Sequence, residues 1–282
     1  MTNYTELKNL YLLCFTDDTE EDAEILFKNV LSKAKSILEY NEKGKPIAML
    51  FLMDANIIVD GNPLPYYYLY AACTRPDYRK KGIMGKLLDK AKKEAIANEK
   101  EGIFLKPANK SLFNFYARYD FKPYFKICKI NTSIKNFTKL FNTGSACTSK
   151  VSLDEWCSLR KSFLSKLSNG YVDFSKDILT TAADGSIAIN SQNFGFVYEK
   201  RDDLLLVKEA ICEKGYTNEL FNAISQIAKT FDVSEIEIRI PVALNNEIEH
   251  FDDLIQDFSV MWLTPNTQKL NPANFYHGFA FD

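Results

Sequence analysis

The pattern of apolar and polar positions divides the first half of the chain into short helices and strands. Residues 5–34 read as two helical pieces separated by the polar stretch TDDTEED, with Thr19 and Asp22 spaced as a capping box at the second piece. Residues 36–53 read as two strands around a glycine turn. A second hairpin is predicted to bend at Asp60-Gly61 and to end near Cys73.

A third helix is predicted to begin at Ile83. Its apolar residues share one helical face and fall at positions 83, 84, 87, 88, 91 and 95. A short buried strand, GIFLKP, follows, and then a helix over SLFNFYARY and a strand over YFKICKINTSI. The first half of the chain therefore mixes helices and strands.

The second half starts after a small, polar stretch at residues 141–150, which reads as a linker or loop. A helix is predicted over SLDEWCSLRKSFLSKL, followed by strands over SIAIN, FGFVYEK and LLLVKEAIC. The two halves echo each other weakly, because Gly82 and Gly215 each open a helix and the next strand ends at Pro107 or Pro241. Duplication and coincidence both remain open as explanations of this echo.

Composition places the chain among globular proteins. It has 282 residues, of which 46% are apolar and 13% aromatic, and this length favours about two domains. The net charge is −2 and the isoelectric point is about 5.9, so the global basic field typical of a nucleic-acid binder is missing.

The cysteine and histidine content argues against a zinc site. None of the six cysteines forms a CxxC pair, and the chain has only two histidines, so no metal is predicted. We expect reduced thiols and a cytoplasmic protein without membrane contact, because the N-terminus has no secretory pattern and no apolar stretch approaches ~20 residues.

A cluster of cations lies where a helix usually carries acids. The segment from Arg75 to Lys93 holds eight Lys or Arg and two Asp, a local charge of +6. Backbone N–H groups at a helix N-terminus carry partial positive charge, so cations there suggest a bound anion, for which phosphate is well suited. Gly82 and Gly85 would let such an anion approach the backbone. The competing interpretation is a solvated basic helix.

Three common phosphate-binding or nucleic-acid-binding patterns do not fit this segment. Gly85-Lys86-Leu87 does not complete a Walker A loop, and no GxGxxG is present. The tetrad from Gly82 to Gly85 imitates the GXXG of a KH module, but it follows a predicted strand, whereas a KH loop joins two helices.

The pattern that fits is that of the GNAT acyl-CoA N-acetyltransferases. The segment YLYAACTRPDYRKKGIMGKLL resembles their motif A, a strand followed by Arg/Gln-x-x-Gly-x-Gly/Ala and a helix, although Met84 stands where Gly or Ala is usual. The segment NKSLFNFYARYDF resembles motif B through Asn109, Phe115, Tyr116 and Phe121, whereas Leu112 and Asp120 depart from it. The tandem arrangement is similar to the branch of the enhanced-intracellular-survival acetyltransferases.

The resemblance implies an α/β (α+β) fold of tandem GNAT-like domains, each with a mixed, mostly antiparallel sheet flanked by helices. It implies a catalytic domain over residues 1–140 and a degenerate second domain over residues 150–282. Acetyl-CoA would be the co-substrate, paired with strand backbone and held by its diphosphate at the start of the helix. The implied cofactor-binding residues are Ala72, Cys73, Thr74, Arg79, Lys80, Lys81, Gly82, Ile83, Met84, Gly85, Lys86 and Asn109.

The resemblance also implies direct attack of an amine on the thioester. Tyr116 stands at the position of the general acid, and a phenol with a pKa of ~10 can protonate a departing thiolate. An amide near Thr74 is the candidate for oxyanion stabilisation. The general base is not identified: Asp54, Glu209 and the C-terminal Asp282 are weak candidates. Cys73 reads as a strand residue, not as a nucleophile.

Two other functions compete with an N-acetyltransferase. One is a non-catalytic acyl-CoA-binding or sensing protein on the same fold, suggested by the departures at Met84, Leu112 and Asp120. The other is a nucleic-acid binder that uses the cations of residues 75–93, although the acidic isoelectric point counts against it. The acceptor, as a small-molecule or peptide amine, and the oligomeric state are not indicated by the sequence.

Overall fold

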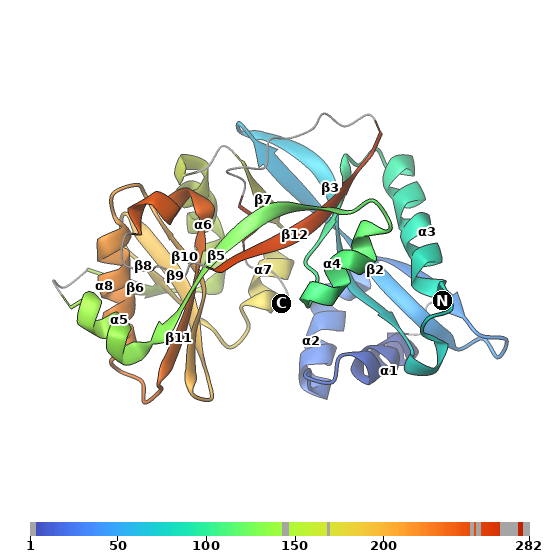
Figure 1. Cartoon of the computed structure of the whole chain (residues 1–282), viewed down its shortest axis with the longest axis horizontal. Helices are drawn as coiled ribbons and strands as arrows, with labels where there is room; N and C mark the ends of the chain where they lie inside the picture. Colours follow the sequence, from blue (N-terminus) through green and yellow to red (C-terminus); the bar gives the residue numbers. More distant parts are fainter. Residues whose placement is uncertain are drawn as a thin grey trace. The chain divides into compact units, whose positions relative to one another are not determined.

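The computed structural model describes residues 4–142, 147–167, 170–248, 251, 255–265 and 276–278. The chain divides into two compact units that are not contiguous in sequence (Figure 1). Unit 1 comprises residues 1–57, 63–124 and 259–270, and unit 2 comprises residues 58–62, 125–258 and 271–282. The predicted catalytic domain over residues 1–140 and degenerate second domain over residues 150–282 stay a prediction.

Unit 1 contains the helices and strands of the N-terminal half and the end of a late strand. They are α1 (Tyr4–Cys14), α2 (Glu20–Asn29), the 3₁₀ helix η1 (Leu31–Lys33), β1 (Lys35–Tyr40), β2 (Pro46–Val59), β3 (Asn62–Thr74), the 3₁₀ helix η2 (Pro76–Tyr78), α3 (Ile83–Ala97), β4 (Gly102–Leu105), α4 (Lys110–Ala117) and β12 (Ile255–Leu263). Apart from β12, which was not predicted, the main helices and strands match the prediction closely, and the predicted capping box at Thr19 is present.

The strands of unit 1 follow the order β1-β2-β3-β4-β12. β1 and β2 pair antiparallel as predicted, and β4 pairs antiparallel with Val260–Leu263 of β12. The hairpin bend at Asp60 and Gly61 has φ values of 47° and 81°, the left-handed conformation that a two-residue hairpin turn requires. β3 and β4 are parallel, because α3 joins them as a crossover.

The core of unit 1 lies where α3 packs on the sheet. Leu87, Leu88 and Ala91 of α3 are fully buried, and they belong to one cluster with Leu50 of β2 and Ile103 of β4. The helical face predicted from residues 83 to 95 is therefore the face that packs. This packing holds the N-terminus of α3 directly after the end of β3.

Unit 2 contains the remaining elements. They are β5 (Lys122–Ser133), which begins in unit 1, α5 (Ile134–Leu140), β6 (Ser149–Val151), α6 (Leu153–Leu167), β7 (Gly170–Phe174), α7 (Lys176–Ala182), β8 (Ile187–Asn190), β9 (Phe194–Arg201), β10 (Leu204–Cys212), α8 (Thr217–Ala228), β11 (Glu235–Pro241) and the 3₁₀ helix η3 (Val242–Glu247). The predicted mixed α/β fold, with largely antiparallel sheet flanked by helices, is confirmed.

Unit 2 repeats the strand–helix–strand order of unit 1. Six of its strands follow the order β5-β11-β10-β9-β8-β6, and β10 and β11 are parallel neighbours joined by α8. Gly215 before α8 has a φ of 85°, and Gly82 before α3 has a φ of 73°. The echo seen in the sequence thus corresponds to the same local architecture, while its origin by duplication stays a prediction.

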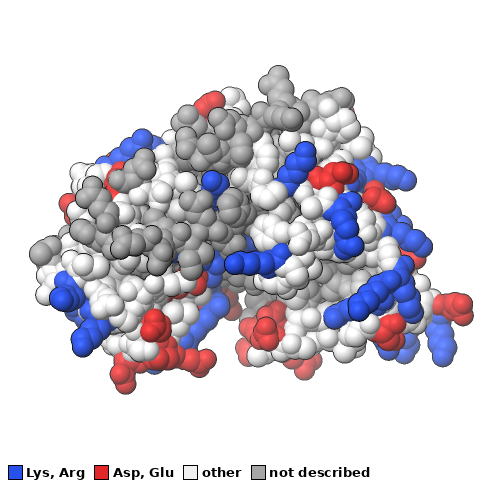
Figure 2. Space-filling view, in the orientation of Figure 1, with Lys and Arg blue, Asp and Glu red and all other residues white. Residues whose placement is uncertain are grey.

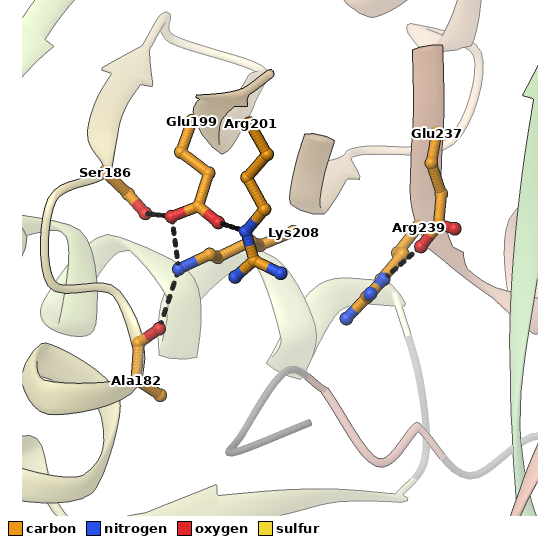
Figure 3. Close-up of polar contacts among 7 residues, drawn as sticks. All are labelled: Ala182, Ser186, Glu199, Arg201, Lys208, Glu237 and Arg239. Carbon is orange, nitrogen blue, oxygen red and sulfur yellow. Dashed lines mark hydrogen bonds and ion pairs between the residues drawn. The ribbon is translucent and has the colours of Figure 1, made fainter. Parts of the chain in front are cut away.

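Buried charges distinguish the interior of unit 2. Arg160 and Glu209 are both fully buried, and the guanidinium Nε lies 2.9 Å from the carboxylate. Lys208 on β10 is also buried and contacts Glu199 at 2.7 Å and the carbonyl of Ala182 at 2.9 Å (Figure 3). Burial lowers the pKa of Lys208, while Glu199 opposes that shift. Each of these buried cations therefore has an acid as its partner.

Among the helices that the structure describes, none is long and apolar enough to cross a membrane.

The Arg160–Glu209 pair leads to a stability prediction. Glu209→Gln should lower the free energy of unfolding by about 3–5 kcal/mol, because it leaves a buried guanidinium without its counter-charge. Urea unfolding followed by circular dichroism measures this. Glu213→Gln is the matched control: Glu213 pairs with Lys166 on the surface, so this change should cost under ~1 kcal/mol. Equal losses in the two variants would contradict the prediction.

Candidate active site

A cavity of about 640 Å³ opens in unit 1 where the end of β3, the start of α3 and the end of α4 converge. This volume lies within the usual range of small-molecule sites, roughly 300–1,000 Å³. Its lining residues are Cys14, Phe15, Ala72, Cys73, Thr74, Tyr78, Arg79, Lys80, Gly82, Ile83, Met84, Gly85, Leu112, Phe115, Tyr116, Arg118 and Tyr119. Ten of the predicted site residues are in this set, so the two sequence motifs meet at one cavity.

The end of β3 leaves extended backbone at the cavity wall. The parallel pairing with β4 covers Tyr66–Tyr68, and β4 itself ends at Leu105, so residues 72–74 continue past it. Ala71 has a φ of 51°, a left-handed conformation that a residue with a Cβ adopts only under strain of ~1–3 kcal/mol. Such a residue bends a strand, and the stretch after it is available to pair with an extended ligand.

The turn between β3 and α3 exposes backbone donors. Lys80 and Gly82 both have left-handed φ values, 62° and 73°, and Gly82 precedes the first residue of α3. No side chain of the N-cap bonds to the helix, and the first turn contains no acid. The N–H groups of the first turn are therefore available to an anion, and the anion site that the cation cluster indicates stays a prediction.

The predicted cations divide into two groups. Arg79 and Lys80 line the cavity, and the Arg79 Nε donates to the carbonyl of Thr74 at 3.0 Å. Lys81 does not line it, because its ammonium lies over the ring of Tyr78, 4.8 Å from the centroid. Lys86 is exposed and also lies outside the lining. In Figure 2, Lys and Arg side chains on the visible face of unit 1 alternate with Asp and Glu.

Helix α4 presents the tyrosine of the second motif. Asn109 caps this helix, and its side-chain oxygen accepts from the backbone N–H of Ser111 at 3.1 Å and of Leu112 at 3.3 Å. This capping role places Asn109 outside the cavity lining. Tyr116 is 6% exposed, lines the cavity and packs against Phe121. Burial raises the pKa of Tyr116 to about 12, so its hydroxyl keeps its proton at neutral pH.

Cys14 is a cavity residue that the sequence analysis missed. A hydrogen bond from the Cys73 thiol and the nearby guanidinium of Arg79 lower the pKa of Cys14 to about 7 against the effect of burial. The same hydrogen bond and burial raise the pKa of Cys73 well above its ordinary value, which agrees with its interpretation as a strand residue. No local pattern marks Cys14, because α1 brings it to β3 from 59 residues away in sequence.

Arg118 and Tyr119 were also missed. The Arg118 guanidinium lies 5.2 Å from the centroid of the Phe115 ring, and Tyr119 packs near the same ring. Both follow Tyr116 within three positions, one helical turn, and this spacing is the signal that could have found them.

Neither Asp54 nor Glu209 lines the cavity. Asp54 forms an exposed ion pair with Lys100 at 2.6 Å. Glu209 is buried in unit 2 and bonds to Arg160. Asp282 lies outside the described residues. No carboxylate is among the described lining residues, so the general base is not assigned to any of these acids.

The sequence and the structure were compared with known proteins. Residues 2–124 match the family model described as an acetyltransferase (GNAT) domain. This part of the chain is a GNAT acetyltransferase domain. The chain therefore contains an acetyltransferase domain, and acyl transfer is the general activity of the family that this part matches. No curated protein matches the sequence significantly.

Solved structures share the fold of this chain over most of its length. A conserved protein from Enterococcus faecalis, titled a probable N-acyltransferase, has a TM-score of 0.75 at 12% identity over 92% of this chain and 70% of its own. A GCN5-related N-acetyltransferase from Anabaena variabilis has a TM-score of 0.72 at 16% identity, covering 93% and 70%. Eis1 from Mycobacterium abscessus has a TM-score of 0.67 at 10% identity, covering 93% and 72%. The likeness to Eis1 matches the predicted tandem branch at the level of the fold.

Within the described ranges of this GNAT protein, no group of three or more His, Cys, Asp or Glu side chains is arranged to hold a metal ion.

The low pKa of Cys14 predicts that this thiol is alkylated at a lower pH than an ordinary thiol. Iodoacetamide should modify Cys14 at a rate that rises with the thiolate fraction, with a midpoint near pH 7, whereas buried Cys73 should stay unmodified. Arg79→Gln should move the midpoint to higher pH, because it removes a charge that stabilises the thiolate. Peptide mass spectrometry after labelling across a pH series measures both rates. A midpoint at the ordinary thiol value of ~8.5 would refute the assignment.

Proposed function

We propose that this GNAT protein transfers an acetyl group from acetyl-CoA to a primary amine of a small molecule or peptide. The carrying observation is one cavity in which extended backbone at Ala72–Thr74, uncapped N–H groups of α3 and the side chain of the buried Tyr116 meet. These three features supply, in turn, a partner for an amide-bearing arm, a partner for a diphosphate and a proton donor.

The residues present fit acetyl-CoA. Its pantetheine arm carries amides that pair with strand backbone, and β3 has such backbone beyond the end of β4. Its diphosphate fits the first turn of α3, where Gly82 leaves open space and the turn holds Arg79 and Lys80. Lys81 and Lys86 add charge from outside the cavity lining, and Asn109 contributes by holding the start of α4.

The reaction begins with the unprotonated amine. Its nitrogen attacks the thioester carbonyl, a C–N bond forms, and the carbonyl oxygen gains negative charge. A backbone N–H near Thr74 stabilises that charge, because a fixed donor in a partly enclosed site costs no reorganisation. The C–S bond then breaks, the nitrogen gives up its proton to solvent or to a base, and the sulfur leaves as a thiolate.

Tyr116 acts on the departing thiolate. Its pKa of about 12 exceeds that of an ordinary thiol, ~8.5. Complete transfer of the proton from Tyr116 to a thiolate of ordinary pKa is therefore uphill by about 5 kcal/mol. A thiolate that forms in the same cavity is poorly solvated, which raises its own pKa and narrows this gap. Tyr116 therefore serves first as a hydrogen-bond donor and then as the general acid.

Binding at the start of α3 can be tested with one charge reversal. Lys80→Glu should weaken acetyl-CoA binding about tenfold or more, because it places a carboxylate beside the diphosphate. Isothermal titration calorimetry measures the dissociation constant. Lys93→Glu is the matched control, since Lys93 is exposed on α3 outside the cavity lining. No binding by the folded wild type would overturn the proposed co-substrate.

The role of Tyr116 can be tested separately. Tyr116→Phe should lower kcat about 100-fold or more with little change in the KM for acetyl-CoA, because it removes the proton donor and keeps the ring. Steady-state release of CoA with a panel of primary amines measures both constants. An unchanged kcat would exclude Tyr116 as the acid. Tight acetyl-CoA binding without turnover of any amine would favour the non-catalytic acyl-CoA sensor.

A further inference from the structure

Gly85 in the first turn of α3 is covered by a side chain from another element. A Cβ built on Gly85 would lie 2.3 Å from the hydroxyl oxygen of Tyr119 and 2.7 Å from two of its ring carbons. Real Cβ atoms essentially never come this close to another atom. Glycine at position 85 is therefore required by the Tyr119 side chain as it is placed.

Tyr119 is held in this position from two sides. Its backbone N–H donates to the carbonyl of Tyr116 at 2.9 Å, directly after the end of α4. Its ring packs 5.3 Å from the ring of Phe115. Among the described residues, no side chain or backbone group forms a hydrogen bond with its hydroxyl, although the residue lines the cavity together with Ile83 and Met84.

This arrangement explains where the chain departs from motif A. Met84 occupies the position where a small residue is usual, and the small residue comes one place later, at Gly85. Because successive residues of an α-helix are about 100° apart around its axis, glycine at position 85 leaves a different part of the helix surface open than a small residue at position 84 would. In this chain, the phenol of Tyr119 occupies the space over Gly85.

We propose that the Tyr119 hydroxyl donates a hydrogen bond to the diphosphate of the acyl-CoA at the first turn of α3, and that Gly85 is present to admit its ring. This inference rests on the acetyl-CoA dependence proposed above. Tyr119 is then a binding residue of this site, supplied by the segment after α4. It adds a neutral donor to the backbone N–H groups and to the cations Arg79 and Lys80.

The decisive comparison uses two acetyl donors. Acetyl-CoA carries the diphosphate, and S-acetylpantetheine lacks it. Tyr119→Phe keeps the ring over Gly85 and removes only the hydroxyl, so it should raise the KM and the dissociation constant for acetyl-CoA about tenfold with unchanged kcat. The same variant should leave the constants for S-acetylpantetheine unchanged. Tyr67→Phe is the matched control, because Tyr67 belongs to the same unit but does not line the cavity.

A double-mutant cycle tests whether Gly85 acts by admitting the ring of Tyr119. Gly85→Ala should weaken acetyl-CoA binding in the wild type, because it displaces Tyr119. The same change in a Tyr119→Ala background should have little further effect, since the ring is already gone. Circular dichroism and thermal unfolding establish that each variant is folded.

The outcomes separate this inference from the function on which it rests. Wild type that binds acetyl-CoA, with Tyr119→Phe binding it equally well, would overturn the role of Tyr119 and leave the proposed function intact. An equal loss for both donors would also overturn it, because the hydroxyl would then act on the pantetheine end or on the fold. Wild type that binds no acetyl-CoA would overturn both.

Discussion

The unpaired N–H groups in the first turn of α3 are the constraint on which the candidate site depends. A helix leaves its first backbone donors without intrahelical partners, and most helices satisfy them with a capping side chain. Gly82 has no side chain to offer, and the described residues provide no other cap. Because β3, the turn after it and the core face of α3 all hold this N-terminus at the cavity, the donors face a space that a ligand can enter.

In unit 2, an acid of the protein binds the corresponding turn before α8. Its helix α8 also follows a strand and a left-handed glycine, but the N–H of Gly215 and the hydroxyl of Thr217 both donate to the carboxylate of Glu247, at 3.0 and 2.6 Å. A carboxylate of the protein itself thus lies beside the start of α8, whereas we assign a phosphate to the start of α3. This difference gives a physical meaning to the predicted degeneracy of the second half. The two halves share a strand–helix–strand plan, and they differ in whether an acid of the chain lies at the turn before the helix.

Burial governs the acid–base properties of the groups around the cavity. It keeps Tyr116 protonated and, with the hydrogen bond to Cys14, Cys73 as well, while the Cys73 thiol and Arg79 favour the Cys14 thiolate. The outcome for each group follows from whether a donor or a cation compensates for lost water. Side chains of similar chemistry therefore take different protonation states within one cavity.

Much of this architecture follows from local sequence patterns. Apolar periodicity located α3 and its packing face, Asp60-Gly61 located a hairpin bend, and the cations before Ile83 with the motif at Tyr116 located the cavity. These features depend on residues that are neighbours along the chain, because helix and strand periods and turn conformations are local. The sequence alone did not show that Asn109 caps α4, or that Lys81 lies over Tyr78 outside the cavity.

The tertiary structure determined which distant residues share the cavity. Packing of α1 beside β3 brings Cys14 to Cys73, and the segment after α4 brings Tyr119 onto Gly85. Glu247 likewise reaches the start of α8 from 30 residues further along the chain than Thr217. No local pattern encodes these contacts, because each depends on the side-chain volumes and backbone directions of two elements packed against each other. The sequence by itself thus determined the class of chemistry, and the fold decided which side chains surround it.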